Sequence, residues 1–293
     1  MVQETPAVQD AIALIKTELK DQYPPGEIRG FTELIFEHLL NYTKTDILVN
    51  NHTKLSNFEV FQIKEFIKQL RNFKPIQYIL GEAWFFDLKL EVSPDVLIPR
   101  PETEELVKWV IEQAGSSSVK VLDIGTGSGC IAIALALNLP LSEVTATDIS
   151  ERGIILAERN AKSYGADIKF ILEDIFHPVI VKSGKYDIIV SNPPYVTESQ
   201  KLLTDKNVLH YEPVAALFVP DHQALVYYEA IIALAREVLN PGGRLFFEIN
   251  ESKSAEIELL LKRHMFSNVE LRKDINGKYR MAGAVFEQFS VQS

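Results

Sequence analysis

From Lys120 onward the chain alternates short strand-like runs with longer helical stretches, and this alternation restricts the possible folds more than any other feature of the sequence. The runs are rich in β-branched and aromatic residues: KVLDI, EVTATDI, IKFILE, YDIIVS and GRLFFEI. Helical stretches such as SERGIILAERNAKSYG separate them. The alternation predicts an α/β fold with a mostly parallel sheet covered by helices on both faces. A turn signal at Asn276-Gly277 predicts a closing antiparallel pair.

Residues 1–73 have a different pattern, in which apolar side chains recur at helical spacing. The recurring residues are Ile12, Ile15 and Leu19, then Phe31, Leu34, Ile35 and Leu39, then Val60, Ile63, Ile67 and Leu70. Breaks fall at YPPG and around NNHTKLSN. A period-two alternation follows at Phe86, Leu88, Leu90 and Val92. It predicts a half-buried strand within a connecting hairpin.

The sequence therefore predicts three parts. A small all-helical domain covers 1–73, a linker with a β-hairpin covers 74–100, and the α/β domain covers 101–293. Counted through Leu80, nine Lys or Arg stand against ten Asp or Glu, so the helical domain is almost neutral. This balance is more typical of a protein-docking module than of a nucleic-acid clamp.

Composition and charge exclude several classes of protein. Hydrophobic residues make up 46% and charged residues 24%, which fits a globular chain rather than a disordered or fibrous one. The net charge of −10 argues against a broad basic face, so no direct reading of nucleic acid is expected.

Cysteine and histidine usage gives no sign of a metal. The single cysteine, Cys130, permits neither an intramolecular disulfide nor a cysteine-based metal site, and it indicates a reducing compartment. The six histidines show no metal-like clustering, so no metal is expected. The N-terminal stretch lacks a signal-peptide pattern, and the longest apolar run, CIAIALAL, is too short to span a membrane. We expect a monomeric cytoplasmic protein without membrane contact.

A glycine-rich loop, DIGTGSGC, follows the first strand of the α/β part. Its glycines allow a sharp turn into the next helix and a close approach to a ligand, and the amides of a helix N-terminus favour an anionic or carboxylate-bearing one. The dinucleotide pattern G-x-G-x-x-G fails here, because its third glycine would stand at Cys130. From the loop alone, a structural turn without any ligand remains an alternative.

Acidic residues follow at the ends of the next two strands. Asp148 ends the second strand, where its carboxylate can accept from ribose hydroxyls. A solvated carboxylate at a strand end is the alternative. After the third strand, Asp174 is placed to take an adenine amino group and Ile175 to cover the adenine ring.

The fourth strand ends in Asn192-Pro193-Pro194-Tyr195. Two adjacent prolines remove two N–H donors and hold φ near about −65°, so the fixed groups that remain are acceptors. An Asn oxygen, a Pro carbonyl and an aromatic ring suit a flat group that donates hydrogen bonds, such as an NH2 on a planar system. A simple turn after a strand is the competing interpretation.

Together these motifs resemble the class I methyltransferases that use S-adenosylmethionine, in which N/D-P-P-Y/F/W marks enzymes that methylate a planar amine. The stretches PIQYILGEAWFFDLKLEVSPDVLIPRPETEELV, LDIGTGSGCIAIALA and VSNPPYV are similar to the HemK-type N5-glutamine methyltransferases, which modify the glutamine of the GGQ motif in peptide-chain release factors. The resemblance covers nearly the whole chain beyond the first helices. It implies a Rossmann-like fold, S-adenosylmethionine as cofactor with S-adenosylhomocysteine as product, and release factors as protein partners.

The same resemblance implies roles for particular residues. The cofactor would bind at Gly125, Thr126, Gly127, Ser128, Gly129, Asp148, Asp174, Ile175 and Asn192. The catalytic set would be Asn192, Pro193, Pro194 and Tyr195. In this set the Asn192 oxygen and the Pro193 carbonyl would accept the amide hydrogens of the glutamine, and Tyr195 would stack on the amide plane.

The segment IPRPETEE has two interpretations. Arg100, Glu102 and Thr103 would lie at the substrate mouth by resemblance, whereas Pro101 and the acidic run equally suit the start of a helix. The chain departs from the family after the fifth strand, where Asn250 replaces the glycine of Glu-Ile-Gly. Its two tryptophans, Trp84 and Trp109, are expected in the core.

Other functions stay open from the sequence. The substrate could be a glutamine in a ribosomal protein, or adenine in a nucleic acid, although the latter normally requires basic and aromatic surface beyond the catalytic core. A binding-only scaffold with a methyltransferase fold is a third possibility, against which the intact glycines and the intact Asn-Pro-Pro-Tyr argue.

Overall fold

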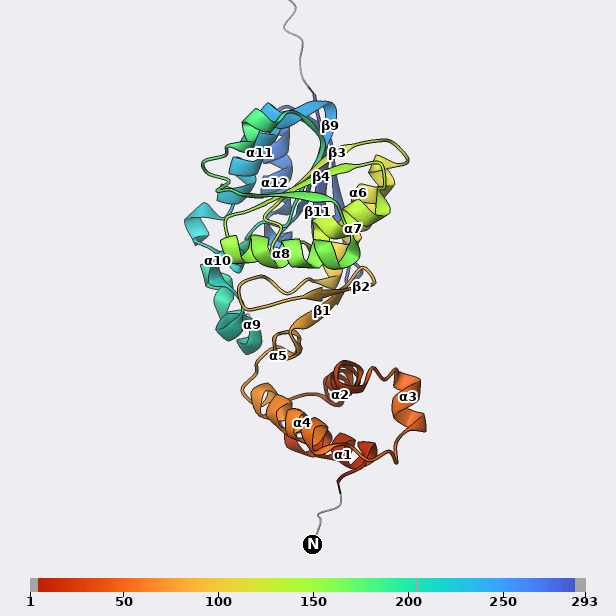
Figure 1. Cartoon of the computed structure of the whole chain (residues 1–293). Coiled ribbons are helices and arrows are strands. Elements are labelled where there is room, and N and C mark those ends of the chain that lie inside the picture. The colour runs from red at the N-terminus through yellow and green to blue at the C-terminus, as the bar shows by residue number, and fades with distance from the viewer. Residues whose placement is uncertain (1–4, 204, 288–293) are drawn as a thin grey trace, which may run out of the picture. The chain divides into compact units, whose positions relative to one another are not determined.

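The structure is a computed structural model that describes residues 5–203 and 205–287 (Figure 1). Residues 1–4 of the predicted helical domain and 288–293 of the predicted α/β domain lie outside the described residues. The chain forms two compact units: one ends at Gly81 and includes Asp205–Tyr211, and the other contains the remaining residues from Glu82 onward. The first unit extends past residue 73 because Ile76 belongs to its apolar core.

The N-terminal unit is all-helical. Its helices are α1 (Val8–Leu19), α2 (Pro25–Leu40), α3 (Lys44–Val49), α4 (Asn57–Leu70), α5 (Ile76–Leu80) and α9 (Lys206–Tyr211). The apolar faces of α1, α2 and α4 form one core, which includes Ile15, Ile35 and Ile63. Helix α2 begins inside the predicted break YPPG, because proline is well suited to the first position of a helix.

The second unit is built on a seven-stranded sheet with the order β10-β11-β9-β6-β3-β4-β5. The strands are β3 (Lys120–Ile124), β4 (Glu143–Asp148), β5 (Ile168–Leu172), β6 (Tyr186–Ser191), β9 (Leu239–Glu248), β10 (Phe266–Lys273) and β11 (Tyr279–Phe286). The first five are mutually parallel, whereas β11 is antiparallel to both β9 and β10. This sheet confirms the predicted α/β fold with its C-terminal antiparallel pair.

Helices cover both faces of the sheet. One face packs against α6 (Pro101–Ala114), α7 (Cys130–Asn138) and α8 (Glu151–Tyr164), and the other against α11 (Val226–Val238) and α12 (Ser254–Arg263). Successive residues of a strand face opposite sides, so Val121 belongs to the first core and Leu122 to the second. Strands buried on both faces explain why these runs are apolar without alternation.

Short elements complete this unit. They are the helix α10 (Val214–Leu217), the strand pair β7 (Val196–Thr197) and β8 (Phe218–Val219), and the 3-10 turns η1 (Ile180–Ser183), η2 (Glu198–Leu203), η3 (Asp221–Gln223) and η4 (Glu251–Lys253). Strand β3 is followed by β4 and β5 on one side, after which β6 pairs with β3 on the other. The chain therefore reverses its strand order between β3 and β6, which is where α/β sheets bind ligands.

The predicted hairpin exists, but the predicted strand is wrong at its start. The hairpin consists of β1 (Glu82–Phe85) and β2 (Leu88–Glu91), and Phe86 lies in the turn rather than in a strand. Phe86 and Asp87 both have positive φ, 51° and 62°, as two-residue hairpin turns require. Trp84 was expected in the core but is 50% exposed, because β1 buries Ala83 and Phe85 on its other face. Trp109 is buried as predicted.

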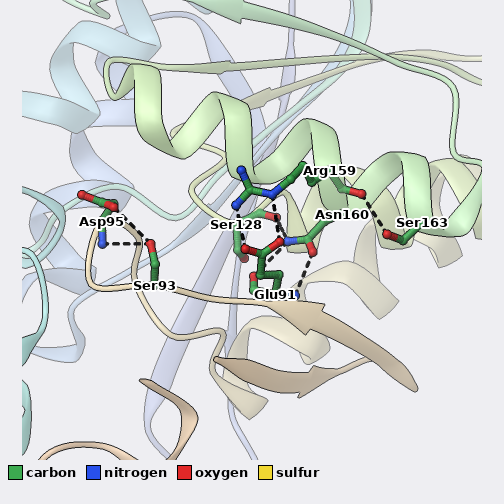
Figure 2. A network of polar contacts seen from close by, with 7 residues as sticks. All are labelled: Glu91, Ser93, Asp95, Ser128, Arg159, Asn160 and Ser163. Carbon is green, nitrogen blue, oxygen red and sulfur yellow. Dashed lines mark hydrogen bonds and ion pairs between the residues drawn. The ribbon is translucent and has the colours of Figure 1, made fainter. Parts of the chain in front are cut away.

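Side chains of helix α8 form hydrogen bonds with the backbone of β2 (Figure 2). Asn160 is 3% exposed; its Oδ1 accepts from the Glu91 amide at 2.8 Å, and its Nδ2 donates to the Glu91 carbonyl at 3.0 Å. The same Nδ2 donates to the carbonyl of Ser128, in the glycine-rich loop, at 2.9 Å. One helix turn later, the Tyr164 hydroxyl bonds to the amide and carbonyl of Lys89. Asn160 thus ties the hairpin to the glycine-rich loop.

We expect Asn160→Asp to lower the free energy of unfolding by about 2 kcal/mol or more, because a buried and a partly buried carbonyl lose their donor. The neighbouring substitution Arg159→Ala is the matched control. It removes only the exposed bidentate pair with Glu91, so its cost should stay below about 1 kcal/mol. Urea unfolding of both variants measures the difference, and equal losses would contradict the role assigned to Asn160.

Candidate active site

A cleft of about 370 Å³ opens where the parallel strands end. Its walls come from the segment after the hairpin, from the loops after β3, β4, β5 and β6, and from the region of α10 and α11. Register brings these loops together, because Ile124 of β3 lies beside Ser191 of β6 and beside Thr147 of β4. Its size and its place at the reversal of strand order are those of a ligand site.

The glycine-rich loop forms one wall of the cleft. Gly125, Gly127 and Gly129 have φ of 76°, 56° and 83°, values that residues with a Cβ rarely adopt. At Gly129 a Cβ would also lie 3.1 Å from the Cβ of Ala157, so glycine is needed for the packing of α7 on α8. The amides of Gly125 and Thr126 donate to the Thr147 carbonyl, which fixes the start of the loop on β4.

Asp148 holds the middle of this loop. Its Oδ2 accepts from the Gly127 amide and its Oδ1 from the Ser150 amide, each at 2.8 Å. Burial raises the pKa of Asp148, while these backbone hydrogen bonds oppose the shift. Each carboxylate oxygen has a further lone pair, so the side chain keeps acceptor capacity toward the cleft that it lines.

The loop after β5 is held by two acids. Glu173 accepts from the amides of Val179 and Ile180 at 2.6 and 2.7 Å, although sequence reasoning did not single it out. Asp174 accepts from the Phe176 amide and contacts His177 Nδ1 at 3.0 Å; the hydrogen bond with His177 is the main cause that lowers the Asp174 pKa. Asp174 and Ile175 both line the cleft.

The first three residues of the Asn-Pro-Pro-Tyr segment line the cleft, and the fourth packs against the apolar core. Asn192, Pro193 and Pro194 line the cleft. The ring of Tyr195 instead packs against the apolar core under α11, and its hydroxyl donates to Glu248 Oε1 at 2.8 Å. Burial raises the pKa of the Tyr195 hydroxyl well above its usual value. The expected stacking of Tyr195 on a substrate amide stays a prediction.

A buried carboxylate, Glu248 at the end of β9, connects the Asn-Pro-Pro-Tyr segment to the start of α6. It is 2% exposed and accepts from Thr103 Oγ1 at 2.6 Å, in addition to Tyr195. Thr103 Oγ1 in turn accepts from Asn192 Nδ2 at 3.4 Å. Burial raises the pKa of Glu248, while the two hydroxyl donors and the charge of Arg280 oppose the shift. The sequence signal for Glu248 was an acid that ends an apolar strand.

The segment IPRPETEE starts a helix and also borders the cleft. Helix α6 begins at Pro101, which confirms the helix-start interpretation. Arg100 and Thr103 line the cleft, and Glu102 does not. Arg100 pairs with Glu212, a buried acid that sequence reasoning did not assign and that also accepts from the Ile98 amide. Glu212 thus anchors the segment that forms this side of the cleft.

Asp123, the last residue but one of β3, is a further acid that the sequence did not assign. It is fully buried, and burial raises its pKa to about 7, although the Thr126 hydroxyl, 2.7 Å from Oδ2, opposes the shift.

No group of three His, Cys, Asp or Glu in 5–203 and 205–287 is arranged to hold a metal ion. Within the same ranges no helix is both long enough and apolar enough to span a membrane.

The sheet order, the glycine-rich loop, the acid at the end of β4 and the Asn-Pro-Pro segment in one cleft define a class I methyltransferase, the class that uses S-adenosylmethionine. A family model for the methyltransferase small domain matches residues 103–211, and a model for the PrmC N-terminal domain matches residues 10–81. Two solved methyltransferase structures share the fold. One is from Pyrococcus furiosus (21% identity, 70% of this chain, 91% of that chain, TM-score 0.51). The other is a T. thermophilus 16S rRNA methyltransferase in complex with AdoMet and guanosine (20%, 70%, 50%, TM-score 0.53).

Relatives of known name define the family more narrowly. The chain is 42% identical over 272 residues to a release factor glutamine methyltransferase of Bacteroides thetaiotaomicron, which covers 93% of this chain and 98% of the relative. It is 44% identical over 259 residues to that of Flavobacterium psychrophilum, with 87% and 90% covered. The corresponding protein of Bacillus subtilis is 33% identical, with 90% and 93% covered. The chain belongs to the release factor glutamine methyltransferase family.

We expect the Asp123→Asn variant, free of cofactor, to gain stability over the parent as pH rises. In the folded parent the Asp123 pKa is about 7, against an ordinary value of 3.8, so the unfolded chain releases this proton first. Stability of the parent therefore falls between about pH 4 and pH 7, by up to about 4 kcal/mol, and Asn removes this loss. Urea unfolding of both proteins at pH 5 and pH 8 measures the difference in the free energy of unfolding between variant and parent. If this difference does not grow with pH, Asp123 does not have a raised pKa in the folded protein.

Proposed function

We propose that this protein transfers a methyl group from S-adenosylmethionine to the side-chain amide nitrogen of the glutamine in the GGQ motif of peptide-chain release factors. The observation that carries the proposal is the placement of Asn192 and Pro193 in the same cleft as the glycine-rich loop. Among the described residues, none donates to Asn192 Oδ1, so this oxygen is left for a ligand. Membership of the family supports the choice of substrate.

The donor set of the cleft fits S-adenosylmethionine. Asp148 has acceptor capacity for ribose hydroxyls, and Gly125 and Gly127 have open space where a side chain would otherwise stand. Ile175 offers an apolar surface for the adenine, and Asp174 an acceptor for its amino group. Thr126, Ser128 and Gly129 complete the loop that surrounds the cofactor. When bound, the cofactor supplies an electrophilic methyl group on a sulfonium.

The protein's own contribution is to orient a poor nucleophile. The lone pair of a glutamine amide is delocalised into its carbonyl, so the nitrogen must be held in one orientation. The Asn192 side-chain oxygen and the Pro193 carbonyl each accept one amide hydrogen, which directs the face of the nitrogen toward the methyl group. Pro194 adds an apolar wall without a competing donor. Such alignment of reacting atoms accounts for several kcal/mol of the barrier.

We further propose that the N-terminal helical unit docks the release factor. Phe58 and Phe61 lie three residues apart on α4, hence on one face, and are 66% and 59% exposed. Leu48 and Val49, at the end of α3, are each 75% exposed. Exposed large apolar side chains on a nearly neutral unit suit a protein partner. Because release factors act at translating ribosomes, we place the reaction in the cytoplasm.

Asn192→Ala is expected to lower turnover by about a hundredfold or more while cofactor affinity stays near that of the parent, because substrate orientation is the main contribution that the substitution removes. Mass spectrometry of purified release factor measures methylation of the GGQ peptide, and calorimetry measures cofactor binding. Asp148→Ala is the matched control and should show the reverse pattern, with cofactor affinity reduced first. Full turnover in a folded Asn192→Ala protein would overturn the mechanism. An unmethylated GGQ peptide with the parent enzyme and saturating cofactor would instead point to another substrate.

The Phe58→Ser/Phe61→Ser double variant is expected to raise KM for full-length release factor by about tenfold, with kcat and cofactor affinity unchanged, because exposed aromatic anchors are lost. Leu141→Ser is the matched control: Leu141 is 64% exposed, and it precedes β4 at the edge of the sheet opposite the cleft. Steady-state kinetics with release factor as the varied substrate measures the effect. The same KM in both variants would exclude this face of α4 from docking.

A further inference from the structure

Glu248 accepts hydrogen bonds from two segments beside the cleft, the start of α6 and the Asn-Pro-Pro-Tyr segment. Its Oε2 accepts from Thr103 of α6 at 2.6 Å, and its Oε1 accepts from Tyr195 of the Asn-Pro-Pro-Tyr segment at 2.8 Å. Thr103 also accepts from Asn192 Nδ2. A continuous hydrogen-bonded path thus runs from a buried carboxylate on β9 to the amide that faces the cleft.

Hydrogen bonds along this path have one possible direction. An ionised carboxylate can only accept, so Thr103 must donate its single hydroxyl proton to Glu248. Thr103 Oγ1 has then no proton left and can only accept from Asn192. The side-chain amide of Asn192 must therefore point its Nδ2 toward Thr103. The oxygen of Asn192 is consequently the end of the amide that remains for a ligand in the cleft.

The surroundings of Glu248 maintain this direction. Tyr195 donates to the other carboxylate oxygen, Oε1, so among the described residues Thr103 is the side chain that donates to Oε2. Burial raises the pKa of Glu248, and the hydrogen bonds from Thr103 and Tyr195 together with the positive charge of Arg280 oppose this shift in favour of the ionised carboxylate. Asn250 donates to the Tyr195 carbonyl at 3.1 Å and so fixes the loop on which Tyr195 lies.

We propose that Glu248 is a positioning residue, which fixes the orientation of the Asn192 amide through Thr103. Glu248 does not touch the substrate. The inference rests on the proposed function, in which the Asn192 oxygen accepts a hydrogen from the substrate amide. Without a fixed acceptor behind Thr103 the Asn192 amide can turn, because its two ends have nearly the same size and differ only in hydrogen-bond polarity.

The test reverses the polarity of the path. Glu248→Gln offers an amide donor to Thr103, which frees the Thr103 hydroxyl to donate to Asn192 and to turn its amide. We expect kcat to fall about tenfold or more, with the dissociation constant of S-adenosylmethionine changed by less than about twofold. In the Asn192→Asp background the same substitution should raise kcat, because the introduced carboxylate needs the Thr103 proton that Glu248 otherwise takes.

A change of sign between the two backgrounds separates positioning from a purely structural role. If Glu248→Gln lowers kcat by the same factor in both backgrounds, or leaves the parental kcat intact in a folded protein, the proposal is wrong. Thr103→Val and Thr103→Ser give a second readout should Asn192→Asp turn over too slowly. Val should lower kcat as Glu248→Gln does, with no further loss when the two are combined, whereas Ser should keep kcat near the parental value. Additive losses would overturn the proposed path.

These outcomes differ from a failure of the proposed function. If Asn192→Ala keeps full turnover on release factor, Asn192 does not orient the substrate, and the function of the cleft must be reconsidered. If Asn192→Ala is inactive but Glu248→Gln has parental kcat, the proposed function stands and only the role of Glu248 is lost. Thermal unfolding of every variant shows whether a lost activity reflects a lost fold.

Discussion

The cleft depends on carboxylates at the ends of strands, each of which accepts hydrogen bonds from the loop that it holds. Asp148 holds the glycine-rich loop, Glu173 the loop after β5, and Glu248 the Asn-Pro-Pro-Tyr segment together with the start of α6. Parallel strands end at one edge of a sheet, so acids at their ends gather around one site. A loop held in this way keeps its donors and acceptors in fixed positions without help from its own secondary structure.

Burying acids has an electrostatic cost that the fold partly offsets. Burial raises the pKa of Asp123, Asp148 and Glu248, which means that their charged forms are less stable here than in water. Hydrogen bonds from Thr126, from backbone amides and from Thr103 lower that cost. The same negative field favours a cationic ligand, and the sulfonium of the proposed cofactor carries such a charge.

Side chains from distant parts of the chain connect the segments that surround the cleft. Asn160 on α8 joins the hairpin to the glycine-rich loop (Figure 2). Glu212 fixes the segment before α6 through Arg100 and the Ile98 amide. Both are buried polar groups whose hydrogen bonds go to backbone or to a charged partner. Such groups are costly when unpaired, so they specify one arrangement of the loops rather than several.

Local sequence was enough to predict the order of strands and helices, the turns in the glycine-rich loop and the missing backbone donors of Pro193-Pro194, because each follows from periodicity or from the covalent limits of glycine and proline. It also placed Asp148, Asp174 and Ile175 at strand ends that line the cleft. The packed fold was needed to show that the Tyr195 hydroxyl donates to Glu248, that Thr103 contacts Asn192 and that Glu248 and Asn160 hold the loops. These contacts join residues far apart in the chain, and no local pattern encodes which buried acid or amide a given loop will meet once the sheet has formed.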